Sequence, residues 1–294
     1  TETMLHALAK TDRNGVEWLL ENRHGVIHVT SGKDRVPAVL GGNAYDGMMT
    51  TDPVSNLNMT HRLYWLAALH PGPERVLVIG FSGGAWTEIL RNFPTVQQID
   101  VVEINKGYID LVKERAPYRE LLNDPRIIFH FDDGRRWLRA NPGRQFDLIV
   151  MNNTFHWRAY STNLLSREFM QILSEHMTPQ SLLAFNATGS PDALATAASV
   201  FPHAYRWVQS NFIYAAKWDF RILDLPAARD RLISLVHSMP EANHYSPEKE
   251  GEVVDKWLHT SLLNDGSHGK SAWILKVHQQ LLSERPLEVI TDRN

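Results

Sequence analysis

The 294-residue sequence contains no cysteine, no long hydrophobic run and no excess of basic residues. Without cysteine, the chain cannot form a disulfide scaffold, a thiolate zinc site, an iron–sulfur cluster or a cysteine nucleophile. Its apolar runs, such as Leu148 to Met151, fall far short of the roughly 18 residues that a membrane-spanning helix needs. Residues 1–20 also lack the pattern of a signal peptide.

The charge balance limits the kinds of partner. Lys and Arg total 30 against 33 Asp and Glu, so no overall basic field exists to attract nucleic acid. We therefore expect a small-molecule substrate and no nucleic-acid partner, and we leave a homodimer open. We expect a cytoplasmic protein, or a soluble domain of a longer or membrane-anchored one. A chain of this length with 43% hydrophobic residues can bury a full-sized enzyme core.

Changes in hydrophobic period divide the chain into three regions. Residues 1–60 are expected to form an N-terminal hairpin lid, with a helical patch over residues 16–20, strands at residues 25–30 and 36–40, and a turn-rich stretch from Tyr45 to Pro53. Residues 61–216 are expected to form a Rossmann-like core that starts with a helix over residues 61–69. Residues 217–294 carry Trp and Leu at helical spacing and predict a C-terminal helical appendage.

The core region alternates short β-branched runs with helical periods, which is typical of βαβ units around a mostly parallel sheet. The last two expected strands are joined by so few residues that they must be antiparallel neighbours. The predicted fold class is therefore α/β, with a mostly parallel sheet that ends in an antiparallel strand. The expected strands cover residues 76–79, 98–102, 127–131, 146–151, 182–186, 205–208 and 212–216.

Three successive strand ends carry residues suited to a nucleoside. The first strand runs into the turn Gly80-Phe81-Ser82-Gly83-Gly84 and then a helix, which is the position of nucleotide-binding turns. Glu103 ends the second strand, about 20 residues further on, where an acidic side chain can accept both ribose hydroxyls. Asp133-Gly134 follows the third strand, and its carboxylate can accept from an adenine amino group or cap the next helix. Because no phosphate-binding loop is present, S-adenosylmethionine fits better than ATP.

The same segments resemble the spermidine synthase (polyamine aminopropyltransferase) family over about residues 25–215. The resemblance implies a Rossmann-like methyltransferase core and a co-substrate that is S-adenosylmethionine or its decarboxylated form. It also implies that Glu103 holds the ribose, Asp133 the adenine and the Gly80–Gly84 turn the donor chain. The motifs that carry it are residues 75–84, Val101-Val102-Glu103-Ile104, Asp124-Pro125-Arg126, Asp133-Gly134, Phe146 to Val150 and Leu164 to Phe169.

The departures from this family concern its carboxylates. The family carries an acidic residue in the glycine turn, where this chain has Ser82. In the family, the fourth strand ends in Asp-Ser-Ser-Asp, whose carboxylates deprotonate the attacking amine and hold a distant ammonium group. This chain has Asn152-Asn153-Thr154-Phe155 there. An amide cannot act as a base near neutral pH and a phenyl ring cannot pair with a cation, so ordinary spermidine synthesis is not expected.

The segment from Asn152 to Tyr160 is expected to form a loop over the mouth of the site. We predict Asn152, His156 and Tyr160 as catalytic residues: Asn152 to orient an amine, and also to contact the co-substrate, and His156 because it titrates near pH 7. Aromatic faces in this segment can stabilise a sulfonium. The predicted substrate-binding residues are Asn153, Phe155, Trp157 and Tyr45.

Further candidates are weaker. Asp46 and Asp52 could supply a carboxylate to the cleft, although turn and cap roles are commoner for Asp, and Tyr64 could line the same mouth. The histidines show no spacing typical of metal ligands, so no metal is predicted.

Four outcomes stay open at this stage. Attack on the three-carbon chain of the donor, with release of methylthioadenosine, is favoured because the lid and the loop follow the family. Attack on the methyl group would instead release S-adenosylhomocysteine. The donor's own amine could attack, so that the molecule cyclises or eliminates. Finally, the chain could be an inactive, nucleoside-binding regulatory domain.

Overall fold

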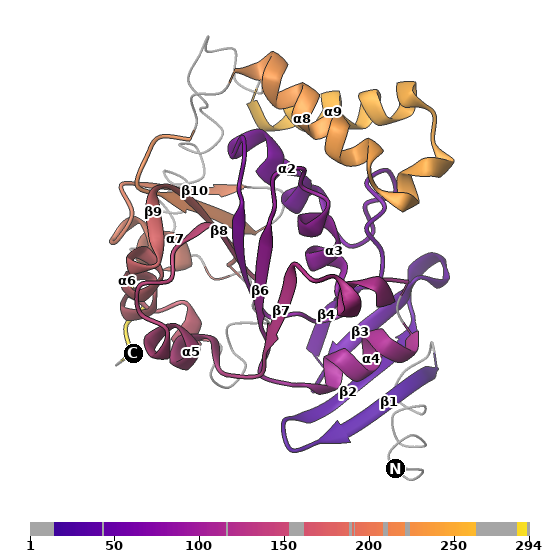
Figure 1. Ribbon diagram of the computed structural model, residues 1–294, viewed down its shortest axis with the longest axis horizontal. Coiled ribbons are helices and arrows are strands. Elements are labelled where there is room, and N and C mark those ends of the chain that lie inside the picture. The colour runs from indigo at the N-terminus through magenta and orange to yellow at the C-terminus, as the bar shows by residue number, and fades with distance from the viewer. Residues whose placement is uncertain are drawn as a thin grey trace.

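The computed structural model describes residues 15–42, 44–115, 117–152, 162–187, 190, 192–207, 211–220, 224–262 and 287–292. It confirms the α/β fold class. A seven-stranded, mostly parallel sheet lies between two layers of helices, and a smaller four-stranded sheet lies beside it (Figure 1).

The large sheet brings the ends of its parallel strands to one edge. β5 pairs in parallel with β6 and β8, β6 with β7, and β8 with β9. β11 runs antiparallel to both β9 and β10, which confirms the expected antiparallel pair. In spatial order the strands are β10 (His203–Trp207), β11 (Phe212–Ala216), β9 (Met177–Asn186), β8 (Phe146–Met151), β5 (Arg75–Ile79), β6 (Gln98–Val102) and β7 (Ile127–His130).

Both faces of this sheet are buried, which explains why its strands read as continuous apolar runs. In β5, Val76 and Val78 belong to one hydrophobic cluster, and Leu77 and Ile79 to the other. The helices of the first cluster are α2 (His61–Leu69), α3 (Ala85–Arg91), α4 (Gly107–Arg115), α8 (Leu225–His237) and α9 (Pro247–Leu262). Those of the second are α5 (Gly134–Ala140), α6 (Arg167–Glu175) and α7 (Asp192–Ala198). Short 3₁₀ turns occur at η1 (Lys33–Arg35), η2 (Arg119–Asn123), η3 (Thr162–Leu164) and η4 (Pro240–His244).

The small sheet, which we call the lid sheet, corrects the expected two-stranded hairpin. It consists of four antiparallel strands, β1 (Val16–Asn22), β2 (Gly25–Ser31), β3 (Pro37–Gly41) and β4 (Ala44–Met48). The helical patch predicted over residues 16–20 is wrong, because these residues pair with β2 across a turn that Gly25 makes at φ +115. The turn predicted at Tyr45 is also wrong, because Tyr45 lies within β4.

The C-terminal helices pack on the core rather than standing apart from it. Trp257 of α9 stacks on Tyr64 of α2, with ring centroids 5.6 Å apart. Glu241 of η4 accepts hydrogen bonds from the Thr50 hydroxyl at 2.6 Å and the Tyr118 hydroxyl at 2.9 Å. Residues 287–292 are not helical, and they return to α6, where the Arg167 N–H donates to the Ile290 carbonyl at 2.8 Å.

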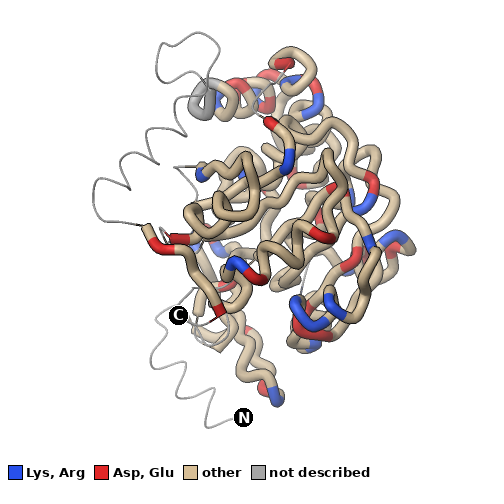
Figure 2. Tube along the Cα trace, turned by 90° about the vertical axis from the view of Figure 1, so that its left-hand side faces the viewer, with Lys and Arg blue, Asp and Glu red and all other residues tan. Residues whose placement is uncertain are grey.

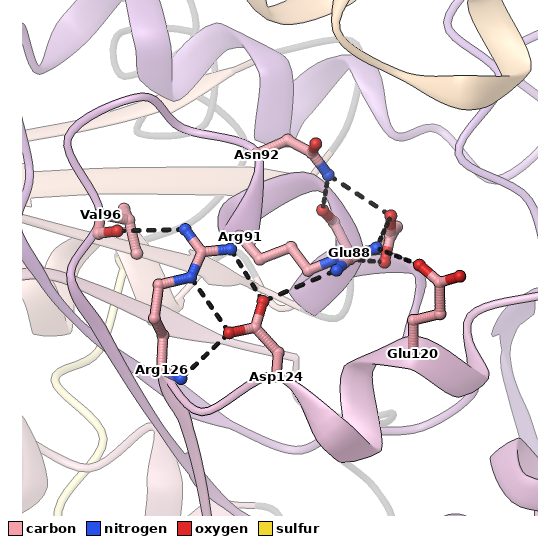
Figure 3. A network of polar contacts seen from close by, with 7 residues as sticks. All are labelled: Glu88, Arg91, Asn92, Val96, Glu120, Asp124 and Arg126. Carbon is pink, nitrogen blue, oxygen red and sulfur yellow. Dashed lines mark hydrogen bonds and ion pairs between the residues drawn. The ribbon is translucent and has the colours of Figure 1, made fainter.

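The Asp124-Pro125-Arg126 motif has a structural role at the amino-terminal end of β7 (Figure 3). Asp124 Oδ2 lies 2.8 Å from Arg126 Nη2 and 3.6 Å from Arg91 Nη1, while Arg91 Nε lies 2.7 Å from Glu88. The hydrogen bond from Arg126 lowers the pKa of Asp124 to about 2. This network ties the end of α3 to the loop before β7, on the side of the sheet away from the carboxyl ends of the strands.

Charges of both signs are interspersed along the described trace (Figure 2). No helix among the described residues is long and apolar enough to cross a membrane.

Candidate functional site

A cavity of about 510 Å³ lies at the carboxyl ends of β5, β6, β7 and β8, under the lid sheet. This volume is within the range of small-molecule sites. The strand wall of the cavity is formed by Ile79, Gly80, Ser82, Val102, Glu103, Ile104, Asn105, Tyr108, Asp132, Asp133, Gly134, Asn152 and Leu164. The lid wall is formed by Arg23, His24, Val26, Gly41, Gly42 and Asp46.

Glu103 is the most buried carboxylate described in the strand wall, with 5% of its surface exposed. Its Oε2 accepts the Phe81 N–H at 2.7 Å, and its Oε1 accepts the Asn105 N–H at 2.8 Å. Burial raises the pKa of Glu103 above its usual value, while these backbone hydrogen bonds act in the opposite direction. Glu103 also lines the cavity, where its carboxylate can accept a hydrogen bond from a ligand hydroxyl.

The glycine turn depends on Gly80, whose φ is +90. The Asn152 N–H donates to the Ile79 carbonyl at 2.9 Å, which extends the β8–β5 pairing and brings Asn152 beside Gly80. A Cβ atom at position 80 would lie 2.8 Å from the Asn152 carbonyl oxygen. The close approach of these two strand ends therefore requires glycine, for its conformation and for its size.

Asp133 has the capping role that the sequence allowed. It is the N-cap of α5, and its Oδ1 accepts the Arg136 N–H at 2.9 Å. The same residue lines the cavity, so its remaining oxygen is placed to accept from a ligand. Gly134 is constrained as well, because a Cβ atom there would lie 2.8 Å from Ile79 Cγ2.

The lid wall is joined to the strand wall by polar contacts. Asn22 Nδ2 donates to Asn105 Oδ1 at 2.7 Å, which fixes the β1–β2 turn against the end of β6. The Ser82 hydroxyl donates to the Asp46 carbonyl at 2.9 Å, and the Tyr108 hydroxyl donates to Asp46 Oδ2.

The structure brings together six of the predicted site residues on the cavity wall: Gly80, Ser82, Glu103, Asp133, Gly134 and Asn152. Asp46, the weaker candidate for a carboxylate in the cleft, lines the cavity as well. The other two predicted residues of the turn, Gly83 and Gly84, do not line the cavity. A Cβ atom at Gly83 would meet Met49 and Val39 of the lid sheet, and one at Gly84 would meet Leu121 and Phe81.

Other candidates fall outside the cavity lining. Tyr45 is 46% exposed. Tyr64 is fully buried and its hydroxyl donates to the Thr51 carbonyl, so the expectation that it lines the mouth is wrong. Asp52 accepts the Val54 N–H and the Tyr245 hydroxyl, both at 2.8 Å. The predictions for Asn153, Phe155, His156, Trp157 and Tyr160 lie outside the described residues.

Most residues of the lid wall, and also Asn105 and Tyr108 of the strand wall, are not among the residues predicted from the sequence. Tyr108 belongs to the buried core cluster, being 7% exposed, although it also lines the cavity. The sequence feature that could have revealed the lid wall is the stretch from Asn22 to Gly25, which joins two apolar runs as a hairpin turn does. Among the described residues, no group of three or more His, Cys, Asp or Glu side chains is placed to hold a metal.

The model of the family described as the spermine/spermidine synthase domain matches residues 64–195. Polyamine aminopropyltransferases are similar over part of this chain. The one from Leptospira biflexa is 39% identical over 87 residues, which cover 29% of this chain and 30% of the relative. The one from Agathobacter rectalis is 32% identical over 126 residues, which cover 42% of this chain and 39% of the relative. The chain thus matches less than half the length of these relatives.

Two solved spermidine synthases share the fold. One, in complex with the transition-state analogue AdoDATO, aligns with a TM-score of 0.58 at 17% identity, over 69% of this chain and 74% of that chain. The other, from Thermotoga maritima, aligns with a TM-score of 0.55 at 16% identity, over 69% of this chain and 73% of that chain. The chain therefore shares the Rossmann-like α/β fold of these two structures. Residues 64–195 match the model of the spermine/spermidine synthase domain, which confirms the resemblance read from the sequence.

Proposed function

We propose that the protein is a transferase that moves the three-carbon chain of S-adenosylmethionine, or of its decarboxylated form, to an amine that is not a typical polyamine. The observation that carries this proposal is the cavity in which Glu103, Asp133 and the turn at Gly80 converge. The matched domain and the names of the relatives support transferase chemistry. The AdoDATO complex of a similar fold supports an adenosyl ligand.

The charges of the cavity suit a cationic donor. Among its described lining residues are four carboxylates, Asp46, Glu103, Asp132 and Asp133, and one guanidinium, that of Arg23. A sulfonium with an ammonium group carries positive charge that such a cavity attracts. Glu103 would accept the ribose hydroxyls, and Asp133 would accept the adenine amino group.

The acceptor side supports an amine other than a dicationic polyamine. Ser82 and Asn152 line the cavity where the family resemblance leads one to expect carboxylates. Neither side chain carries charge, so neither can neutralise an ammonium group or deprotonate it near pH 7. The Asn152 amide oxygen can instead accept a hydrogen bond from an amine and orient it. Asn152→Ala should therefore lower turnover more than donor affinity.

The reaction is a displacement at carbon. The amine nitrogen forms a bond to the carbon of the three-carbon chain that is attached to sulfur. The bond between this carbon and sulfur breaks, and its electron pair passes to sulfur. The proton lost from nitrogen goes to solvent. The sulfonium loses its charge on reaction, so tight ground-state binding of that cation does not accelerate the step. Orientation of the amine at about 3–3.5 Å, in line with the breaking bond, contributes more.

The test is to incubate the protein with each donor form, with and without candidate amines, and to identify the nucleoside product by mass spectrometry. Methylthioadenosine formed together with an alkylated amine supports the proposal. Methylthioadenosine formed without any amine indicates attack by the donor's own amine. S-adenosylhomocysteine as the sole product would establish methyl transfer instead.

Two further results would overturn the proposal. Efficient spermidine formation from decarboxylated donor and putrescine would show that the acceptor is an ordinary polyamine. Binding of methylthioadenosine without turnover of any donor and amine pair would indicate the nucleoside-binding regulatory domain.

A further inference from the structure

We infer that Asp46 is the carboxylate that binds the donor's primary ammonium group, and that Tyr108 is its positioning residue. This inference rests on the proposed function and names a binding residue on the lid wall. It gives the lid sheet a part in recognising the charge of the donor.

A β-bulge aims Asp46 into the cavity. In the β3–β4 pair the register passes from Val39 opposite Gly47 to Leu40 opposite Tyr45, so Asp46 is the extra residue between them. A bulge turns a side chain away from the regular alternation of a strand, and bulges are frequent next to active sites. Asp46 accordingly lines the cavity, whereas its neighbour Tyr45 does not.

The Asp46 carboxylate is held in place by a built contact. The Tyr108 hydroxyl donates to Asp46 Oδ2, and the Tyr108 ring belongs to the buried core cluster. Gly41 of β3 leaves the room for this contact, because a Cβ atom at position 41 would overlap both Asp46 Oδ2 and the Tyr108 hydroxyl. A hydroxyl donor fixes the orientation of the carboxylate.

The position of Asp46 along the cavity matches the chain end of the donor. Its carbonyl accepts the Ser82 hydroxyl at 2.9 Å, which fixes Asp46 beside the glycine turn. Glu103 and Asp133, assigned to ribose and adenine, stand at the ends of β6 and β7 instead. A donor laid along these residues therefore brings its ammonium group toward Asp46. A carboxylate–ammonium hydrogen bond is charge-assisted and about twice as strong as a neutral one.

The other described carboxylates near the cavity have different partners. Glu103 accepts two backbone N–H groups, and Asp133 caps α5. Asp132 forms an ion pair with Arg136. Asp52, the other carboxylate considered on the lid side, is bonded to Val54 and Tyr245 away from the cavity.

Calorimetry with two ligands tests the inference. S-adenosylmethionine has the ammonium group and methylthioadenosine lacks it. Asp46→Asn should weaken S-adenosylmethionine binding about 10- to 100-fold and change methylthioadenosine binding by less than about twofold. Tyr108→Phe should weaken S-adenosylmethionine binding by a smaller factor, again with little effect on methylthioadenosine. The matched control is Asp34→Asn, because Asp34 is exposed and its φ of +55 suits asparagine.

Each outcome bears on a separate claim. Unchanged S-adenosylmethionine affinity in Asp46→Asn, or equal losses for both ligands, would overturn the role of Asp46 while the wild-type binding still supports the proposed function. If the wild-type protein binds neither ligand, the proposed function and this inference fail together.

Discussion

The strand wall and the lid wall of the cavity differ in how the chain builds them. Most residues of the strand wall lie at the ends of parallel strands, as Gly80, Glu103 and Asp133 do, so their meeting at one edge follows from the order of strands and helices. The lid wall depends on antiparallel register, a bulge and contacts between residues far apart in sequence, such as Asp46 and Tyr108. The strand wall is thus a local consequence of the fold, and the lid wall is a product of tertiary packing.

The largest effect that can test the strand wall is expected from Glu103→Ala. The loss of two charge-assisted hydrogen bonds to ribose should weaken methylthioadenosine binding by about 3 kcal/mol. The variant also leaves the Phe81 and Asn105 N–H groups without their carboxylate, so it should unfold at a lower temperature. Calorimetry and thermal unfolding measure the two effects.

The control for this variant is Glu120→Ala, because the Glu120 side chain is 86% exposed and lies outside the cavity. It should change neither binding nor unfolding appreciably. Unchanged nucleoside affinity in Glu103→Ala would remove the ribose assignment, and with it the main support for an adenosyl donor.

The next effect concerns the close approach of strand ends within the strand wall. Gly80→Ala should destabilise the fold by about 2–3 kcal/mol, since it combines an unfavourable backbone conformation with a contact to the Asn152 carbonyl. Gly143→Ala is a matched control, because Gly143 has φ +83 but no atom lies within 4 Å of the point that a Cβ atom would occupy there. Gly143→Ala should lower the free energy of unfolding by about 1 kcal/mol. Urea unfolding compares the two, and equal losses would show that the approach of Asn152 adds nothing.

The strand wall could be predicted from sequence because each of its key residues follows an apolar run of the expected length. The lid wall could not, for two physical reasons. The adjacent apolar residues Leu19 and Leu20 in β1 mimic one face of a helix, although a partner strand fixes them in a sheet. The sequence offers Asp46 to the cleft only as a weaker candidate beside a turn role, and the bulge opposite Leu40 is what aims it inward.

The segment that joins the lid sheet to the core should respond to pH through His61, at the start of α2. His61 Nδ1 lies 2.7 Å from Asn56 Nδ2, and burial lowers the pKa of His61 to about 4, with the charge of Arg62 acting in the same direction. The folded protein keeps this ring neutral, whereas the unfolded chain takes up a proton below about pH 6.5. The stability linked to His61 is therefore present above that pH and is lost as the pH falls toward 4.

At pH 5 this loss should reach about 2 kcal/mol. Urea unfolding at pH 7 and pH 5 measures it, with His61→Gln as the comparison. The variant should be less stable than the wild type at pH 7 but should lose less stability between the two pH values. An equal loss in both proteins would mean that other groups cause the pH dependence.

The smallest effect separates the two roles of Asp133 in the strand wall. As the N-cap of α5 it accepts the Arg136 N–H, and removing such a cap costs about 1 kcal/mol. Asp133→Ala should therefore lower both the free energy of unfolding and the affinity for methylthioadenosine. Asp133→Ser keeps a capping oxygen but removes the carboxylate that would receive the adenine amino group, so it should restore stability while affinity stays about tenfold reduced. If serine restores affinity as well, Asp133 acts only through the helix, and adenine recognition must come from backbone groups of the same wall.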